Sequence, residues 1–287
     1  MKRLIQRVRA RLAPGQRQPT SEELLQQFHA NGCKPWTPGY DLYKWDAITR
    51  CINAETPFSQ VVGTPRFGYR IDERIVEYGW LFERLPAGPG VMLDAGSALN
   101  FAPIITHPAI ASKRLFISTL APESHAFWNL GVSYVYEDLR ESCFRDDMFD
   151  VIACISTIEH VGLDNTMLYT ADTRLAEDRP HTYLDLVDVL RRLLKPGGVL
   201  FMSFPYGAYK NHGWFQVFNA EMVTAVIDRF GPASHEETIF QYADDRWQRS
   251  TREQAKDATC FDINVQKEYD ADMAAFSRGI ACLELVK

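Results

Sequence analysis

From residue 91 to its end, the chain alternates short apolar runs with helical or polar segments. Such alternation is typical of a mostly parallel β-sheet that is covered by helices on both faces. The runs are VMLDA (91–95), RLFIST (114–119), VSYVY (132–136), DVIACIS (150–156), GVLFMSF (198–204), ETIFQY (237–242) and GIACLELV (279–286). We therefore predict an α/β fold with a doubly wound, seven-stranded sheet.

Helical spacing of apolar residues marks the segments that would cover this sheet. In DERIVEYGWLFERL (72–85), Ile75, Tyr78, Leu81 (or Phe82) and Leu85 share one face, and Pro86 ends the pattern. Residues 181–195 show the same spacing, and residues 219–230 begin with an Asn cap. A further helix is predicted at SEELLQQFHANG, capped by Ser21 or Thr20.

The pattern divides the chain into three parts. Residues 1–20 form a basic tail, residues 21–70 an N-terminal accessory segment with helices, and residues 71–287 the main domain. Residues 243–278 separate the last two predicted strands by more than a hairpin requires. We interpret them as an insertion that shapes substrate access.

Charge is distributed unevenly along the chain. Residues 1–17 carry six basic residues and no acid, so the remainder has a net charge of about −12, which argues against a nucleic-acid-binding body. The favoured interpretation of the start is a frayed tail that ends at Pro14-Gly15. Two alternatives stay open: an organellar transit peptide, or a helix that places Leu4, Ile5, Val8 and Leu12 on an anionic membrane surface.

No apolar run reaches the roughly 18 residues of a membrane span, and arginines interrupt the basic start where a secretory signal needs an apolar stretch. The six cysteines are scattered and include no CxxC pair. We therefore expect a cytoplasmic protein, or one at the periphery of the membrane, with reduced thiols. No metal-ligand residues are predicted, and a metal requirement stays open. The oligomeric state stays open.

In open parallel sheets, ligands bind at the carboxyl ends of the strands. The segments that follow the predicted strands are AGSALNF, Glu137-Asp138-Leu139-Arg140, Thr157-Ile158-Glu159-His160-Val161-Gly162 and Pro205-Tyr206-Gly207. Three longer stretches overlap these segments in order, about 45–55 residues apart: VMLDAGSALNF, YEDLRESCFRDDMFDVIACISTIEHV and LLKPGGVLFMSFP.

These three stretches resemble the class I S-adenosylmethionine-dependent methyltransferases, and the resemblance covers residues 75–287. It implies a Rossmann-like methyltransferase fold whose last strand is antiparallel, an enzyme, and S-adenosylmethionine as cofactor. The resemblance also implies that Asp94 orients the loop and the cofactor's ammonium group. Asp138 would accept the adenine amino group, with Leu139 beside the ring. The alternatives are an Asp94 that caps turn amides and an Asp138 that is a surface acid.

The loop after the first strand keeps a single glycine, Gly96. Further glycines let backbone amides approach a diphosphate. S-adenosylmethionine has no phosphate, so Gly96 can supply the turn while Ser97 and Ala98 keep the wall thin. Asn100 replaces a backbone contact if its amide points inward. The loop therefore argues against NAD more than against S-adenosylmethionine.

The second strand departs from the resembled pattern, which ends this strand with an acid that holds the ribose. Here Ser118 and Thr119 end the run, and Glu123 follows four residues later. Either Glu123 folds back or the hydroxyls substitute. Thr119 and Ser156, at the end of the fourth strand, are also predicted to contact the cofactor. The predicted cofactor-binding residues are therefore Asp94, Gly96, Ser97, Asn100, Thr119, Asp138, Leu139 and Ser156.

Methyl transfer to a hydroxyl needs a base for the acceptor's proton. His160 is the first candidate because imidazole titrates near neutral pH, and His212 is the second. A structural His160 is the alternative. Asp164 and Asn165 could position a sugar or a metal, although a solvated insertion is favoured. Four aromatic residues could stack on the acceptor: Tyr206, Tyr209, Trp214 and Phe215.

The predicted function is O-methylation of a small molecule or glycan. LDAGSALNF and ISTIEHVGLDNT resemble a subgroup associated with bacterial cell-surface polysaccharide synthesis. A catalytically inactive methyltransferase-like binding protein is one alternative, and a nucleotide-sugar-modifying Rossmann enzyme is another. The second should carry a Tyr-x-x-x-Lys pair and a glycine trio, which the sequence lacks. A nucleic-acid methyltransferase fits neither the acidic body nor the STIE segment.

Overall fold

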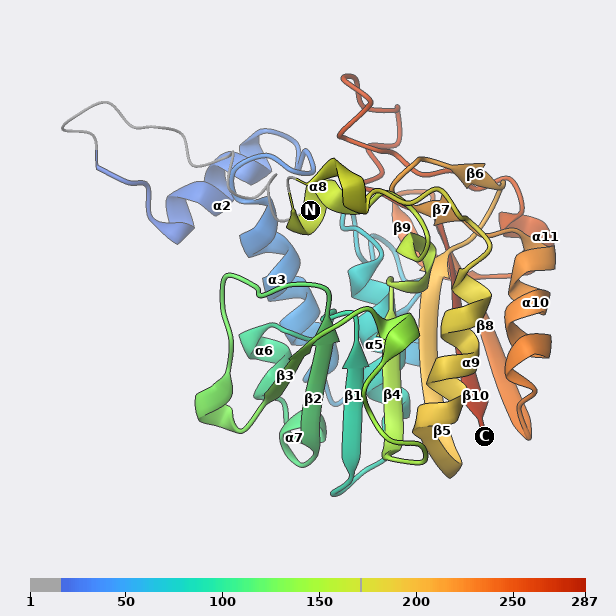
Figure 1. Cartoon of the computed structure of the whole chain (residues 1–287). Coiled ribbons are helices and arrows are strands. Elements are labelled where there is room, and N and C mark those ends of the chain that lie inside the picture. Colours follow the sequence, from blue (N-terminus) through green and yellow to red (C-terminus); the bar gives the residue numbers. More distant parts are fainter. Residues whose placement is uncertain (1–16, 171) are drawn as a thin grey trace.

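A computed structural model describes residues 17–170 and 172–287 (Figure 1). The interpretations of the basic tail therefore lie almost wholly outside the described residues. Arg17, the first described residue, pairs with Glu23 at 2.7 Å. No helix in residues 17–170 and 172–287 is long and apolar enough to cross a membrane.

An eight-stranded sheet runs through the molecule in the order β3-β2-β1-β4-β5-β10-β8-β9. The strands from β3 to β5 are parallel, and β10 runs antiparallel to both β5 and β8. Their bounds are β1 (Val91–Ala95), β2 (Arg114–Thr119), β3 (Ser133–Tyr136), β4 (Phe149–Ile155), β5 (Leu194–Pro205), β8 (Ser234–Ala243), β9 (Arg246–Ser250) and β10 (Gly279–Val286). The predicted doubly wound sheet with an antiparallel last strand is confirmed.

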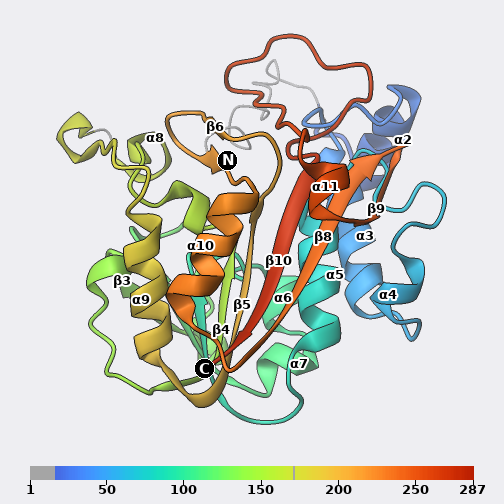
Figure 2. The same ribbon diagram turned by 90° about the vertical axis from the view of Figure 1, so that its right-hand side faces the viewer.

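Both faces of the sheet are covered, as Figure 2 shows. Successive strand residues point to opposite faces. Met92 accordingly packs in the core beneath α5 (Arg74–Arg84), while Leu93 packs in the core beneath α9 (Tyr183–Leu193) and α10 (Ala220–Phe230). This two-sided burial explains why the sequence shows continuous apolar runs rather than alternating ones.

The predicted helices are present, with small shifts at their ends. The helix predicted at 181–195 is α9, which ends at Leu193 because β5 begins at Leu194. Asn219 caps α10, as predicted. In α2 (Ser21–Ala30) the cap is Thr20, which forms a capping box with Glu23.

The accessory segment packs into the main core. Its other helices are α3 (Tyr40–Ile52) and α4 (Phe58–Val61), and Ile48 and Phe58 belong to the core that holds Ile75. A buried ion pair from Lys44 to Asp72, 2.5 Å long, ties α3 to the start of α5. Burial of this pair fixes the position of the first turn of α5.

The region predicted as an insertion begins with an eighth strand. β9 pairs with β8 at the sheet edge, and α11 (Arg252–Ala255) follows it. The prediction of seven strands missed β9 because RWQRS contains one apolar residue, as an edge strand can. A two-stranded hairpin, β6 (Lys210–Asn211) and β7 (Gln216–Val217), was also missed.

Short helices complete the described chain. They are α6 (Ala102–Ile105), α7 (Pro108–Ala111), η1 (Trp128–Leu130), η2 (Leu139–Glu141), η3 (Ile158–His160), α8 (Thr166–Tyr169) and η4 (Thr173–Leu175). Of these, η2 and η3 directly follow the ends of β3 and β4.

Candidate functional site

The turn after β1 is organised by Asp94. Its carboxylate accepts the backbone N–H of Ala98 at 3.1 Å and that of Leu99 at 2.8 Å. Burial raises the pKa of Asp94 to about 7, and its bond from Leu99 opposes that rise. Asp94 therefore caps the turn amides, which was the structural alternative for this residue, and its predicted contact with a cofactor stays a prediction.

Gly96 lies against the end of β4. Its φ is +114°, and a Cβ at this position would lie 2.1 Å from Oγ1 of Thr157. The next residue, Ser97, also has a positive φ of 64°. We expected small residues here to leave a thin-walled hollow, but the side chain of Thr157 packs against Gly96. The glycine is thus required by this contact, whatever binds nearby.

Glu123 folds back onto the β1 turn. The hydroxyl of Ser97 donates to Oε1 of Glu123, and the amide of Asn100 donates to Oε2 at 2.8 Å. Asn100 is buried and points inward, and its Oδ1 accepts the Tyr134 hydroxyl at 2.9 Å. Of the two options that the sequence left open for the acid missing from β2, folding back is therefore the one observed.

The ends of β2 and β3 hold the remaining cofactor candidates. Ser118 donates to Glu137 at 3.0 Å, so this hydroxyl is already used. Thr119 is the last residue of β2, partly exposed, and its carbonyl accepts the N–H of Glu137. Leu139 is buried in the first position of η2.

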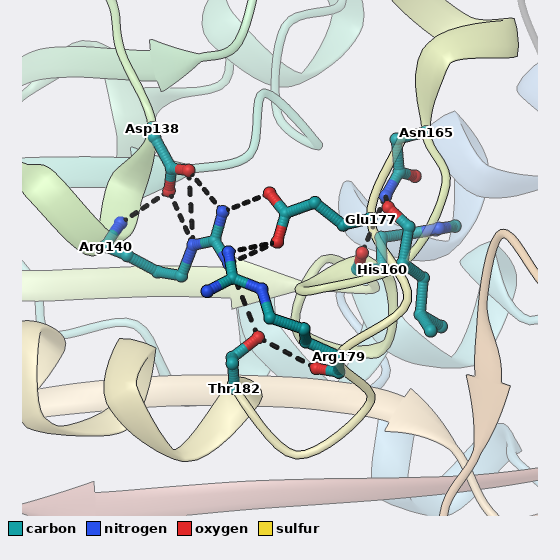
Figure 3. Close-up of polar contacts among 8 residues, drawn as sticks. Asp138, Arg140, His160, Asn165, Glu177, Arg179 and Thr182 are labelled. Atoms are coloured by element: carbon teal, nitrogen blue, oxygen red, sulfur yellow. Dashed lines mark hydrogen bonds and ion pairs between the residues drawn. The ribbon is translucent and has the colours of Figure 1, made fainter. Parts of the chain in front are cut away.

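Asp138 is held by Arg140 (Figure 3). The Arg140 guanidinium donates to Asp138 through Nε at 3.0 Å and through Nη2 at 2.5 Å. The same guanidinium donates to Glu177 through Nη1 at 2.8 Å and through Nη2 at 2.5 Å. Burial acts to raise the pKa of Asp138, but the hydrogen bonds from Arg140 hold this pKa below its usual range. An adenine amino group at Asp138 would compete with Arg140.

Glu177 belongs to a segment, residues 172–182, that crosses the carboxyl edge near η2 and η3. Arg179 anchors the segment, because its backbone N–H donates to the carbonyl of Gly162 at 2.6 Å; within the segment, its side chain pairs with Glu177 at 2.7 Å. Bonding from Arg140 lowers the pKa of Glu177 to about 2. Arg140 therefore joins the end of β3 to the segment that follows β4 (Figure 3).

His160 lies in η3 with one ring nitrogen engaged. Nδ1 lies 2.8 Å from the carbonyl oxygen of Trp214, so the ring donates there and its Nε2 carries the lone pair. Burial lowers the pKa of His160 to about 4, and the Trp214 carbonyl opposes that shift. A neutral ring with a free Nε2 is the form that can accept a proton.

Glu159 lies beside His160 and was not predicted as a site residue. Its Oε1 is 3.9 Å from Nε2 of His160, and its Oε2 is buried with no hydrogen-bond partner in the described part of the chain. Burial raises the pKa of Glu159 well above its usual value. A buried polar atom without a partner is a place where a ligand donor would be favourable.

The structure does not bring His212 into contact with His160. The His212 ring stacks on Phe215 with centroids 4.2 Å apart, and its Nε2 has no partner among the described residues. Nδ1 of His212 lies 3.9 Å from Asp262, which accepts the indole N–H of Trp214 at 3.0 Å. The two histidines therefore flank one aromatic cluster.

Asn165 anchors η3 rather than facing solvent. Its amide donates to the carbonyl of His160 at 2.6 Å and to that of Leu163 at 2.9 Å. The carboxylate of Asp164 accepts hydrogen bonds from the backbone N–H and the hydroxyl of Thr166. In the described part of the chain, no three His, Cys, Asp or Glu side chains are grouped as metal ligands.

Sequence reasoning missed the first turn of α5. Glu77 is fully buried and accepts the hydroxyls of Ser156 at 2.6 Å and Ser203 at 2.7 Å, while Arg74 pairs with it at 2.5 Å. Ser156 has a positive φ of 40°, a strained conformation at the end of β4. The signal that could have found this group is the run of charges in DERIVE at a helix start.

Comparisons with known proteins give similarity to solved structures alone. No protein-family model matches the chain, and no curated protein matches it. A structure of 1,6-didemethyltoxoflavin-N1-methyltransferase from Burkholderia thailandensis, with 1,6-didemethyltoxoflavin and S-adenosylhomocysteine bound, aligns at 12% identity and a TM-score of 0.42, covering 96% of this chain and 93% of that chain.

Phosphoethanolamine N-methyltransferase 2 of Haemonchus contortus, in complex with S-adenosylmethionine, aligns at 13% identity and a TM-score of 0.43, covering 81% of this chain and 60% of that chain. The [4+2]-cyclase SpnF aligns at 15% identity and a TM-score of 0.39, covering 76% and 75%. At these values the alignments assign no reaction, ligand or partner to this chain.

Proposed function

We propose that this chain is an S-adenosylmethionine-dependent methyltransferase that methylates a hydroxyl of a small molecule or glycan. One observation carries the proposal: Glu123 folds back onto the β1 turn. Because it does so, each of the neighbouring strands β1, β2 and β3 has a carboxylate at its carboxyl end: Asp94 is the last residue but one of β1, and Glu123 and Asp138 follow β2 and β3. This is the set of acids that the resemblance requires along one edge of the sheet.

The donor set fits the parts of this cofactor. Asp94 and the unpartnered oxygen of Glu159 suit an ammonium group, and Glu123 suits the two ribose hydroxyls. Asp138 suits the adenine amino group once Arg140 releases it. The remaining predicted contacts lie in or beside the ends of β1, β2 and β3, except Ser156, which follows β4; they are Gly96, Ser97, Asn100, Thr119, Leu139 and Ser156.

When bound, the cofactor would supply a methyl group activated on a sulfonium. The chain's own part is to orient the acceptor and to remove its proton. His160 suits the second task because its Nδ1 donates to Trp214 and leaves the Nε2 lone pair free. Burial lowers its pKa to about 4, so the ring is neutral at pH 7, but its Nε2 is a weaker base than an ordinary imidazole nitrogen. Aromatic rings of Trp214 and Phe215 stand beside it.

A diphosphate ligand, as in a nucleotide-sugar enzyme, fits the β1 turn poorly. Diphosphates are bound by free backbone N–H groups. In this turn, the N–H groups of Ala98 and Leu99 are already bonded to Asp94. The carboxylates of Asp94 and Glu123 would also repel a polyanion.

A catalytically inactive binding protein is the second candidate function. It is favoured by the ion pairs from Arg140, which occupy the carboxylate predicted to bind adenine. Calorimetric titration with S-adenosylhomocysteine separates the two, since the enzyme must bind it and the inactive protein need not. Subsequent transfer of a labelled methyl group to hydroxyl-bearing acceptors tests the finer claim. The link to polysaccharide synthesis rests on the sequence resemblance of two segments.

A further inference from the structure

We propose that Arg66 and Arg70 form a binding site for a phosphate group, carried by a small molecule or by a lipid headgroup. Both arginines lie in the segment that joins α4 to α5. The inference goes beyond the proposed function and does not depend on it. The resemblance gives these arginines no role.

The segment that carries the two arginines packs on the β9 edge of the sheet. The N–H of Trp247 in β9 donates to the carbonyl of Phe67 at 2.9 Å, and the N–H of Arg70 donates to the hydroxyl of Tyr242 in β8 at 3.0 Å. The side chain of Arg70 also donates to the carbonyl of Gly32, just after α2. Because β5 and β10 separate β8 from β4, this place is distinct from the candidate site at the ends of β1 to β4.

Both guanidinium groups lie over one aromatic ring. Cζ of Arg66 is 3.6 Å from the centroid of the Tyr69 ring, and Cζ of Arg70 is 4.9 Å from it. The Tyr43 hydroxyl donates to the carbonyl of Tyr69 at 3.1 Å and helps to hold this residue in place. A guanidinium that lies over a ring keeps its N–H groups available to other acceptors. The two arginines are therefore close enough for one anion to accept hydrogen bonds from both.

This pair of positive charges is not neutralised by an acid. Within the described residues, neither arginine forms an ion pair. Burial raises the pKa of the Cys33 thiol, and the charges of Arg70 and Arg66 oppose that rise without an acid acting beside them. Burial and the charge of Asp245 raise the pKa of Tyr242, yet Asp245 pairs with neither arginine. In a chain of net charge −6, two uncompensated cations attract an anion.

Most of the donors on the two side chains are unused. Arg66 is exposed, and its guanidinium bonds to none of the residues that the structure describes. Arg70 donates to Gly32 through Nη1 only, so its Nε and Nη2 have no acceptor in the described chain, and this Nε is buried. Phosphate suits such a set, because its oxygens accept paired N–H bonds from guanidinium groups.

The backbone of both arginines has a conformation that favours glycine. The φ angle is +63° at Arg66 and +56° at Arg70, and Gly68 between them also has a φ of +63°. Turn bonds fix this shape, since the N–H of Tyr69 donates to Arg66 at 3.1 Å and that of Ile71 donates to Gly68 at 3.0 Å. Glycine would relieve the strain at either arginine but would remove a guanidinium. Strain that persists in this way is typical of binding sites.

The test is calorimetric titration with glycerol 3-phosphate at constant ionic strength, with chloride as the balancing anion. We expect the unmodified protein to bind this ligand, and Arg66→Gln to bind it about tenfold more weakly. Arg114→Gln is the matched control and should bind as the unmodified protein does. Arg114 is also exposed and lies over a ring, with Cζ 5.0 Å from the centroid of Phe116, but no other described arginine shares that ring.

Arg70→Lys is the second variant. Lysine keeps the charge but loses the planar set of donors, so affinity for glycerol 3-phosphate should fall by a smaller factor than in Arg66→Gln. A similar affinity in Arg70→Lys and the unmodified protein would mean that Arg70 serves only to hold Gly32, and it would overturn the two-arginine site.

Vesicles of phosphatidylcholine that contain phosphatidic acid, tested by co-sedimentation, distinguish the two sources of phosphate. Binding of glycerol 3-phosphate that depends on Arg66 assigns a small molecule, and such binding of vesicles alone assigns a lipid headgroup. The inference is overturned if the unmodified protein binds neither probe, if Arg66→Gln changes nothing, or if Arg66→Gln and Arg114→Gln lose binding equally. None of these titrations contains S-adenosylhomocysteine, so their failure leaves the proposed function unaffected.

Discussion

The side-chain amide of Asn100 donates to Oε2 of Glu123 at 2.8 Å and so joins the turn after β1 to the segment after β2. Ser97 donates to the other oxygen of the same carboxylate. Two segments that are separated by a helical crossover are thereby fixed against each other at the sheet edge. Glu123 lies four residues beyond the position expected for this acid. These bonds nevertheless hold its carboxylate at the strand ends, where the proposed ribose site would be.

Glu123→Gln tests this placement. The amide is similar in size but loses the charge, so bonds to ribose hydroxyls should weaken. We expect affinity for S-adenosylhomocysteine to fall about tenfold. Glu141→Gln, which changes an exposed acid in η2, is the control and should leave the affinity unchanged. Equal affinities for Glu123→Gln and the unmodified protein would remove Glu123 from the site.

Asp94 makes stability depend on pH. Its folded-state pKa is about 7 because of burial, against about 3.9 in an unfolded chain, so the folded state binds the proton more tightly. Its contribution is therefore present at acidic pH and lost as pH rises toward 7. Between pH 5 and pH 7 this group should lower the free energy of unfolding by about 2 kcal/mol.

Asp94→Asn removes that contribution. Urea denaturation should therefore show that the free energy of unfolding falls less between pH 5 and pH 7 in the variant than in the unmodified protein. Glu159, whose pKa burial also raises, contributes with the same sign and remains. His160, whose pKa burial lowers, contributes with the opposite sign in both proteins. The same fall in both proteins would show that Asp94 is ionised throughout the range.

Arg140→Gln should release both carboxylates that Arg140 holds. Asp138 becomes available to adenine, so S-adenosylhomocysteine should bind about three- to tenfold more tightly. Residues 172–182 lose an anchor, so trypsin should cut after Arg174 faster. Arg229→Gln, which removes an exposed pair with Asp188 between α10 and α9, is the control. Weaker binding in Arg140→Gln would show that Arg140 supports the ligand rather than competing with it.

His160 should titrate far below an ordinary histidine. Because burial lowers its pKa to about 4, its NMR signals should show no protonation above pH 5, against about 6.5 for an unperturbed ring. The signals are assigned by their loss in His160→Asn. That variant should keep its affinity for S-adenosylhomocysteine while methyl transfer falls. A midpoint near 6.5 would contradict the buried, carbonyl-bonded ring.

Gly96→Ala should be strongly destabilising. The added Cβ would lie 2.1 Å from Oγ1 of Thr157, at a φ of +114°. We expect a loss of about 3 kcal/mol or more in the free energy of unfolding. Gly88→Ala is the matched control, since Gly88 has a φ of +81° and nothing within 4 Å of an added Cβ. Similar losses in the two variants would mean that Thr157 moves aside.

The sequence predicted those elements whose apolar residues carry a repeat. The runs at 91–95, 114–119 and 279–286 match β1, β2 and β10 to the residue, because a polar residue, proline or glycine lies just outside most of their ends. The sequence did not predict β9, because this edge strand has a single large apolar residue, Trp247.

The site was predicted less completely, for a physical reason. Motif order could place Asp94, Asp138 and His160 at strand ends, since parallel strands end at the same edge. It could not show that Arg140 occupies Asp138, nor that Glu77 reaches Ser156. Glu77 and Ser156 are 79 residues apart, so their contact depends on packing that no local pattern encodes. Arg140 is only two residues from Asp138, but its guanidinium is also bonded to Glu177, which lies 37 residues further along.

Titration calorimetry of the unmodified protein with S-adenosylhomocysteine tests the central claim most directly. The carboxylates at the carboxyl ends of β1, β2 and β3 predict one site per chain, with a dissociation constant below about 100 μM. Absence of binding at millimolar ligand would contradict the claim that these strand ends hold an adenosyl sulfur compound.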